Sequence, residues 1–120
     1  MIASWSPDLR RLVELIDPAT IFPLSIRTCL PLEHWNTAPV TLLGDAIHGM
    51  PPYGGFGANT AMRDASLLGQ LLRAASRGEK ALLDAICDYE TKMIEYSFDA
   101  ARRSMRILQQ VNQLDPVPFL

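Results

Sequence analysis

The stretch from Gly44 to Asn59, GDAIHGMPPYGGFGAN, constrains the fold of this chain more than any other. Proline fixes φ and glycine permits φ > 0, so the dense group of both residue types between Gly49 and Gly57 cannot continue a helix or a strand. The apolar run Val40 to Leu43 precedes this group, and apolar residues at helical spacing follow it up to about Ser76. The pattern predicts a buried parallel strand, a loop and a helix, with Asn59 at or near the helix start.

Two further helices are expected outside this unit. Ser6, Pro7 and Asp8 supply a capping hydroxyl, a proline and an acid, and the apolar residues after them predict a short helix from about Pro7 to Ile16. From Glu79 onward an apolar residue recurs every three or four positions, which predicts one long helix to about Gln113. The tail from Asp115 to Pro118 cannot continue that helix.

These elements together predict an α/β fold. We expect a few strands, of which Val40 to Leu43 is a buried parallel strand, with the Gly/Pro loop and two or three helices, the last one long. The segment Ile21 to Leu30 alternates loosely between prolines, so we expect it to be extended or an edge strand.

Composition limits the classes of function. The chain has 120 residues, enough for one small domain, and a formal net charge of −2. No run of lysine and arginine with interleaved aromatics occurs, so we expect no nucleic-acid partner. No apolar run reaches the length of a membrane span and no leader pattern follows Met1, so we expect a cytoplasmic location. Cys29 and Cys87 lie far apart in apolar surroundings, which favours two buried thiols over a disulfide or a metal site.

The residue types of the loop indicate a ligand site. Asp45 follows the predicted strand, where a carboxylate can either accept hydrogen bonds from the hydroxyls of a sugar-like chain or cap its own turn. Gly54, Gly55 and Gly57 allow a tight turn or the close approach of a flat ring. The next helix directs its N-terminal N–H groups to the same space, which favours an anion. Because the loop contains no Lys, Ser or Thr, a phosphate loop is not favoured.

Three details of the loop allow a second interpretation. The sequence from Gly55 to Thr60 imitates the start of a dinucleotide fingerprint, but it lacks the third glycine and follows a loop, so we reject it. His48 could act as a base, and we favour a structural, hydrogen-bonding role. Pro51 and Pro52 stiffen the loop, either as a plain rigid turn or as a wall that keeps water from a reactive ring.

These residues resemble the C-terminal part of the FAD-dependent aromatic hydroxylases, the monooxygenases of the para-hydroxybenzoate hydroxylase fold. The resemblance covers the chain from about Ile21 to Ala75, including Trp35, and extends to Tyr89 and Glu90 in the long helix. It implies that residues 1–36 are a remnant of the substrate-domain return strand with a short helix. It also implies that residues 37–115 are the C-terminal part of the FAD-binding domain.

The resemblance implies roles for six residues. Asp45 would bind the ribityl chain of FAD, and Pro52 would flank the reactive edge of the isoalloxazine. The backbone at Gly55, Gly57, Ala58 and Asn59 would lie against the ring and its pyrimidine edge. No residue of this chain is a certain catalytic residue by this resemblance. NAD(P)H would reduce the flavin, and dioxygen would supply the oxygen that is transferred to an aromatic or polyketide-like substrate.

The family also uses a strand followed by G-x-G-x-x-G to hold the adenosine diphosphate half of FAD, and this chain shows none. We therefore expect a flavin-binding segment that is incomplete as an isolated chain. An alternative is a non-catalytic relic or interaction module that self-associates, or pairs with a missing N-terminal part, through its long amphipathic helix. Another flavoprotein of similar fold, such as a halogenase or an epoxidase, is also left open.

Overall fold

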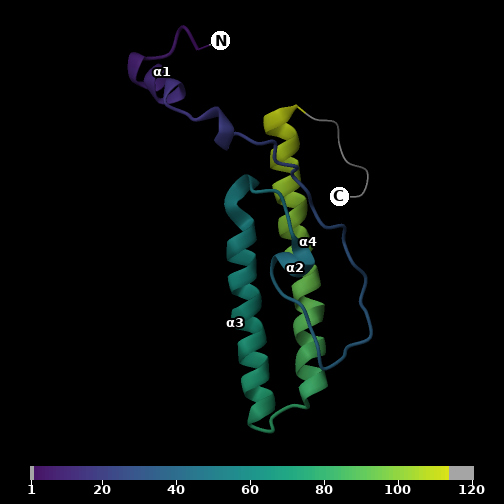
Figure 1. Ribbon diagram of the computed structural model, residues 1–120. Coiled ribbons are helices and arrows are strands. Elements are labelled where there is room, and N and C mark those ends of the chain that lie inside the picture. Colours follow the sequence, from purple (N-terminus) through teal and green to yellow (C-terminus); the bar gives the residue numbers. More distant parts are fainter. Residues whose placement is uncertain (1, 114–120) are drawn as a thin grey trace.

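A long helical hairpin forms the framework of the protein. The computed structural model describes residues 2–113, which contain α1 (Pro7–Glu14), the 3-10 turn η1 (Pro18–Thr20), α2 (Asp45–His48), the 3-10 turn η2 (Tyr53–Gly55), α3 (Phe56–Ser76) and α4 (Leu82–Asn112). In Figure 1, α3 and α4 lie side by side and antiparallel, while the irregular segment between η1 and α2 runs along α4. The hairpin therefore supplies the surface on which the Gly/Pro loop rests.

The turn between α3 and α4 closes the hairpin with a glycine. Gly78 has φ +74°, a left-handed conformation that costs glycine little. Its N–H donates to the carbonyl of Ala75 at 2.9 Å, and the N–H of Glu79 donates to the carbonyl of Ala74 at 3.1 Å. This pair of bonds is the Schellman motif, which satisfies carbonyls that the helix end leaves free.

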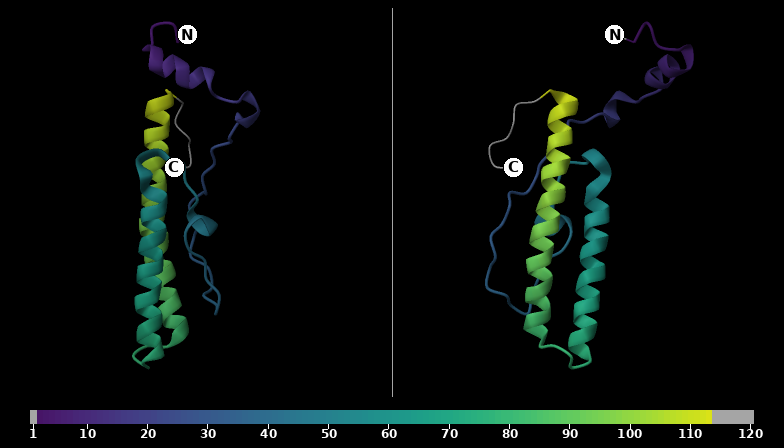
Figure 2. Two further views of the ribbon diagram at one scale, coloured as in Figure 1. Left: turned by 60° about the vertical axis from the view of Figure 1, so that its left-hand side comes forward. Right: turned by 180° about the vertical axis from the view of Figure 1, so that it is seen from behind.

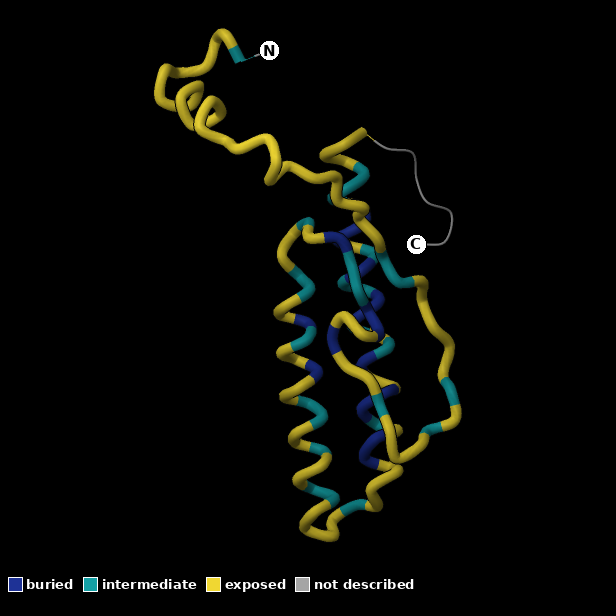
Figure 3. Tube along the Cα trace, viewed as in Figure 1, coloured by how far each residue is buried: buried dark blue, intermediate teal, exposed yellow. Residues whose placement is uncertain are grey.

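The core lies where α2 meets the two long helices. Ile47 of α2 packs on Tyr89 and Met93 of α4, and partly buried apolar residues from three segments surround them: Trp35, Leu67, Leu68, Leu71, Ile94 and Tyr96. Figure 3 shows the buried residues concentrated along one face of α4. That face follows the predicted apolar spacing, so the apolar stripe of α4 is covered by its own chain between Ala85 and Met105.

The predicted α/β fold is wrong. Among residues 2–113 the structure contains no strand, and Val40 to Leu43 runs as irregular chain into α2 instead of forming a buried parallel strand. Val40 is 75% exposed, so its environment is the reverse of a sheet interior. The physical reason is that a strand needs a neighbour to pair with. The segment Ile21 to Leu30 does not pair with it either, since its backbone contact to the loop is the single bond from Cys29 N to Gly49 O at 2.8 Å.

The three predicted helices are present, with shifted ends. The first begins at Pro7 as predicted, with the Ser6 hydroxyl accepting from Leu9 N, and it ends at Glu14. The second begins at Phe56, three residues before Asn59, and ends at Ser76 as expected. The long helix spans Leu82–Asn112, and the tail from Asp115 to Pro118 lies outside the described residues.

Much of the apolar surface of the N-terminal third is exposed. The helix α1 has no buried residue and projects beyond the C-terminal end of α4 (Figure 2). The radius of gyration is 20.1 Å, against about 14 Å for a compact chain of this length. Most of the exposed large apolar side chains therefore lie between Trp5 and Leu43, whereas those on α4, where the sequence placed a pairing face, are confined among the described residues to Leu82, Leu83 and Val111 near its ends.

The two cysteines are free, and they differ in burial. Cys29 is half-buried beside Gly49, whereas Cys87 is exposed on α4, so the prediction of a buried thiol is wrong for Cys87. The residue is exposed because position 87 lies off the buried stripe that contains Ile86 and Tyr89. None of the helices described in residues 2–113 is long and apolar enough to cross a membrane.

Candidate functional site

An open groove of about 560 Å³ lies between the Gly/Pro loop and the start of α3. Its lining joins Asp45 at the start of α2 to the loop and to the first turns of α3: Met50, Pro51, Pro52, Gly55, Gly57, Ala58 and Ala61. Five of the six residues predicted to hold a cofactor therefore line one groove, namely Asp45, Pro52, Gly55, Gly57 and Ala58. The motif brings these residues together because the loop folds back onto the helix that follows it.

Asp45 lies at the rim of this groove and is exposed. It also lines a second hollow of about 400 Å³ with Arg27, Thr28, Cys29, Gly49 and Met50. Among the described residues its carboxylate has no hydrogen-bond partner. The N-terminus of α2, which Gly44 caps, receives no hydrogen bond from a capping side chain, so Asp45 does not supply one. The carboxylate is therefore available to a ligand and does not cap its own turn.

The N-terminus of α3 opens onto the groove without a side-chain cap. The first N–H groups of an α-helix have no partner inside the helix, and together they carry about half a positive charge. Gly57 and Ala58 belong to this first turn and line the groove. A Cβ placed on Gly57 would lie 3.9 Å from Met50 Cγ, its nearest contact, so the missing side chain leaves open space. The groove thus combines a positive helix end with room for a flat group.

Asn59 is the predicted site residue that lies elsewhere. Its Nδ2 donates to the carbonyl of Gly55 at 3.2 Å, and it lines a separate hollow of about 270 Å³ with residues of α3 and α4. The side chain therefore stabilises the turn into α3, because it occupies a carbonyl of the loop. Pro52, by contrast, is exposed at the groove and leaves its ring accessible.

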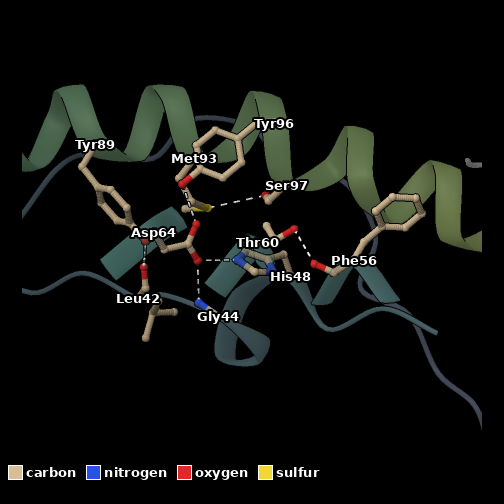
Figure 4. A network of polar contacts seen from close by, with 10 residues as sticks. All are labelled: Leu42, Gly44, His48, Phe56, Thr60, Asp64, Tyr89, Met93, Tyr96 and Ser97. Carbon is tan, nitrogen blue, oxygen red and sulfur yellow. Dashed lines mark hydrogen bonds and ion pairs between the residues drawn. The ribbon is translucent and has the colours of Figure 1, made fainter. Parts of the chain in front are cut away.

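A buried polar network lies directly beneath the loop (Figure 4). Asp64 of α3 has no exposed surface, and its Oδ2 lies 2.8 Å from Gly44 N and 2.5 Å from His48 Nε2. Its Oδ1 accepts from the hydroxyl of Tyr96 at 2.5 Å. An ionised carboxylate can only accept hydrogen bonds, so its contact with His48 requires a hydrogen on Nε2. His48 therefore has the structural, hydrogen-bonding role that the sequence favoured.

Two tyrosines of α4 border the network. Burial, then the hydrogen bond and the negative charge of Asp64, raise the pKa of the Tyr96 phenol well above its usual value, against a lowering effect of Arg63. Burial and the charges of Asp64 and Glu90 raise the pKa of Tyr89 in the same direction. Both phenols therefore remain hydrogen-bond donors, Tyr96 to Asp64 and Tyr89 to the carbonyl of Leu42 at 2.9 Å.

Helix α4 also fixes the segments on either side of α2. The buried carboxylate of Glu90 accepts from Trp35 Nε1 at 3.1 Å, from Thr37 at 2.7 Å and from Thr41 at 2.9 Å. The hydroxyl of Ser104 contacts the carbonyls of Pro51 at 2.5 Å and Tyr53 at 2.8 Å. The proline wall of the groove is thus held from behind by α4.

Sequence reasoning missed Asp64, Tyr96 and Ser104. One signal was available for Asp64, because it lies four residues before Leu68 and three after Ala61, on the apolar stripe of α3. A charged residue on such a stripe indicates a buried, partnered carboxylate. Tyr96 and Ser104 gave no comparable signal, since a Tyr or Ser in an amphipathic helix is ordinary.

Comparison with known proteins identifies the family of the chain. The family described as FAD binding domain matches residues 12–110. The dual O-methyltransferase/FAD-dependent monooxygenase CTB3 of Cercospora beticola is 40% identical over 91 residues, which cover 74% of this chain and 10% of that protein. The FAD-dependent urate hydroxylase of Klebsiella pneumoniae is 33% identical over 90 residues, which cover 75% of this chain and 22% of that enzyme.

A solved structure agrees with these relatives. The crystal structure of a protein from Photorhabdus luminescens, named provisionally as an FAD containing monooxygenase, superposes with a TM-score of 0.71 at 47% identity and covers 86% of this chain and 27% of that one. The chain spans less than a quarter of the length of the two curated relatives. The family match extends over most of the described residues, including the groove, and confirms the resemblance seen in the sequence. The chain belongs to the FAD binding domain family.

Proposed function

We propose that this chain forms the isoalloxazine-binding part of an FAD-dependent monooxygenase that hydroxylates an aromatic or polyketide-like substrate. The observation that carries the proposal is the groove that gathers Asp45, Pro52, Gly55, Gly57 and Ala58 at the uncapped start of α3. The names of the relatives support the reaction class, since they include monooxygenases and a hydroxylase. NAD(P)H as the reductant is part of the same proposal.

The residues of the groove fit a flavin. A flat ring needs a surface without side chains, which Gly55 and Gly57 provide, because a Cβ on either would project into open space. The pyrimidine edge of a reduced flavin is negatively charged, and the N–H groups at Gly57 and Ala58 would stabilise that charge. The free carboxylate of Asp45 would accept hydrogen bonds from the hydroxyls of the ribityl chain.

When bound, the flavin would supply the activation of dioxygen, and this chain's residues would position it. The rings of Pro51 and Pro52 would form a rigid apolar wall that excludes water from one side of the groove. Ser104 would keep that wall in place through the carbonyls of Pro51 and Tyr53. In this proposal, residues 1–36 are a remnant of the substrate domain. Residues 37–115 are the C-terminal part of the FAD-binding domain.

A titration with FAD tests the proposal. Flavin fluorescence should be quenched and the visible absorption band should shift as the purified protein is added, with saturation. The Asp45→Ala variant should bind FAD more weakly by about 1–3 kcal/mol, or roughly 5- to 150-fold, because a charged hydrogen bond is lost. A protein that leaves the flavin spectrum unchanged would contradict the proposal, and an unchanged affinity in the variant would remove Asp45 from the site.

A further inference from the structure

The carboxylate of Asp64 holds both ends of α2 with one oxygen. Its Oδ2 contacts Gly44 N, the residue that caps α2, and His48 Nε2, the last residue of the same helix. Figure 4 shows Asp64 reaching from α3 between these two groups. No other residue of the described chain is bonded by its side chain to both ends of this helix.

The helix α2 depends on such a contact because it is only four residues long. A single helical turn is not stable by itself, since nucleation fixes several backbone dihedrals for one hydrogen bond. Gly44 also has φ +62°, and a Cβ there would lie 3.4 Å from the Cβ of Ala61, so this residue rests directly on α3. Asp45 is the next residue along the chain, and its place at the groove follows from the place of Gly44.

The other oxygen of Asp64 connects α2 to α4. Oδ1 accepts from Tyr96, whose ring lies 3.9 Å from the guanidinium carbon of Arg63. The carboxylate is therefore fixed from both long helices, and its orientation toward Gly44 and His48 is set by the hairpin. Gly44, His48 and Asp64 are all buried, so water does not replace any partner that is removed.

We propose that Asp64 is a positioning residue of the flavin site, which places Asp45 at the groove by holding α2 against the α3–α4 hairpin. The inference rests on the proposed function, since it assigns Asp64 to the same site. Glu90 supplies a matched control. It is a second buried carboxylate with three hydrogen-bond donors, but these donors belong to Trp35, Thr37 and Thr41, none of which lines the groove.

The first test needs no flavin and measures amide hydrogen exchange at Gly44. In the unmodified protein this amide should exchange at least about 100-fold more slowly than an unstructured amide, because its acceptor is a buried carboxylate. Asp64→Ala should remove the protection, Asp64→Asn should retain most of it through the amide oxygen, and Glu90→Gln should leave it unchanged. Free exchange at Gly44 in the unmodified protein would overturn the proposal, even if the alanine variant does not fold.

The second test is a double-mutant cycle on FAD affinity. Asp64→Ala should weaken FAD binding about 10-fold in the unmodified background and less than about 3-fold beside Asp45→Ala, because Asp64 acts through Asp45. Asp64→Asn should restore affinity to within about 3-fold. Equal weakening in both backgrounds would overturn the positioning role. If the unmodified protein binds no FAD, the proposed function fails, and exchange at Gly44 still decides whether Asp64 holds α2.

Discussion

Gly57 is the residue at which the groove and the start of α3 coincide. Its missing side chain leaves space toward Met50, and its N–H belongs to the uncapped first turn. A Cβ at this position would have only Met50 Cγ within 4 Å, at the ordinary van der Waals distance of 3.9 Å, so we expect that a side chain can be introduced without displacing the loop. A substitution at Gly57 can therefore block a ligand sterically without destabilising the fold.

We expect Gly57→Val to abolish most flavin binding, by at least about 10-fold in affinity, while the free energy of unfolding changes by less than about 1 kcal/mol. Gly69→Val is the matched control, because Gly69 lies in the same helix with open space around it and is remote from the groove. Flavin fluorescence titration and denaturant unfolding measure the two quantities. Wild-type affinity in Gly57→Val would exclude close contact between the ring and this turn.

At the scale of elements, α4 supports the groove from behind but contributes none of the residues that line it. Ser104 holds the loop through the carbonyls of Pro51 and Tyr53. Tyr89 and Glu90 hold the segment that leads into α2, and Tyr96 holds Asp64 of α3. The helices were predictable because their apolar spacing is a local signal. The strand was not, because Val40 to Leu43 carries the composition of a buried strand while pairing depends on a neighbour that residues 2–113 do not provide.

The groove was more predictable than its support. Asp45, Pro52, Gly55, Gly57 and Ala58 lie within one motif, so their proximity follows from a single loop. The contacts of Asp64 join residues 16, 20 and 32 positions apart, and no periodicity specifies which donors a buried carboxylate will meet. The exposed position of Val40 has the same origin, since burial depends on the tertiary partner and not on the residue type.

The raised pKa of Tyr96 predicts how stability depends on pH at this element. A group whose folded pKa lies above its unfolded value of about 10 contributes stability that is complete below pH 10 and is lost as pH rises toward the folded pKa. We therefore expect the free energy of unfolding to fall between pH 10 and pH 12. The free energy of unfolding of Tyr96→Phe should fall less over this range, because the variant lacks the phenol that must ionise. Denaturant unfolding at pH 8 and pH 11 measures both, and an equal decline in the two proteins would contradict the assignment.

At the scale of the whole molecule, the chain consists of a packed part and an exposed part. The packed part is the α3–α4 hairpin with α2 and the loop, where the buried residues lie. The exposed part is most of residues 2–43, where large apolar side chains from Trp5 to Leu43 face outward. Within it, Trp35 packs against the core, and Thr37 and Thr41 bond to Glu90. The packed part contains every residue that lines the groove, so the candidate site does not depend on α1.

This division predicts the effect of removing residues 1–20. Because α1 and η1 contain no buried residue, their removal should shift the thermal midpoint by less than about 4 °C, which corresponds to less than about 1 kcal/mol for a domain of this size. Met93→Ala is the contrasting variant, since Met93 is fully buried in the core, and it should destabilise the protein by about 2–5 kcal/mol. Circular dichroism at 222 nm follows both transitions. A truncated protein that melts as early as Met93→Ala would show that α1 packs on the hairpin, and the separation into a packed and an exposed part would then be wrong.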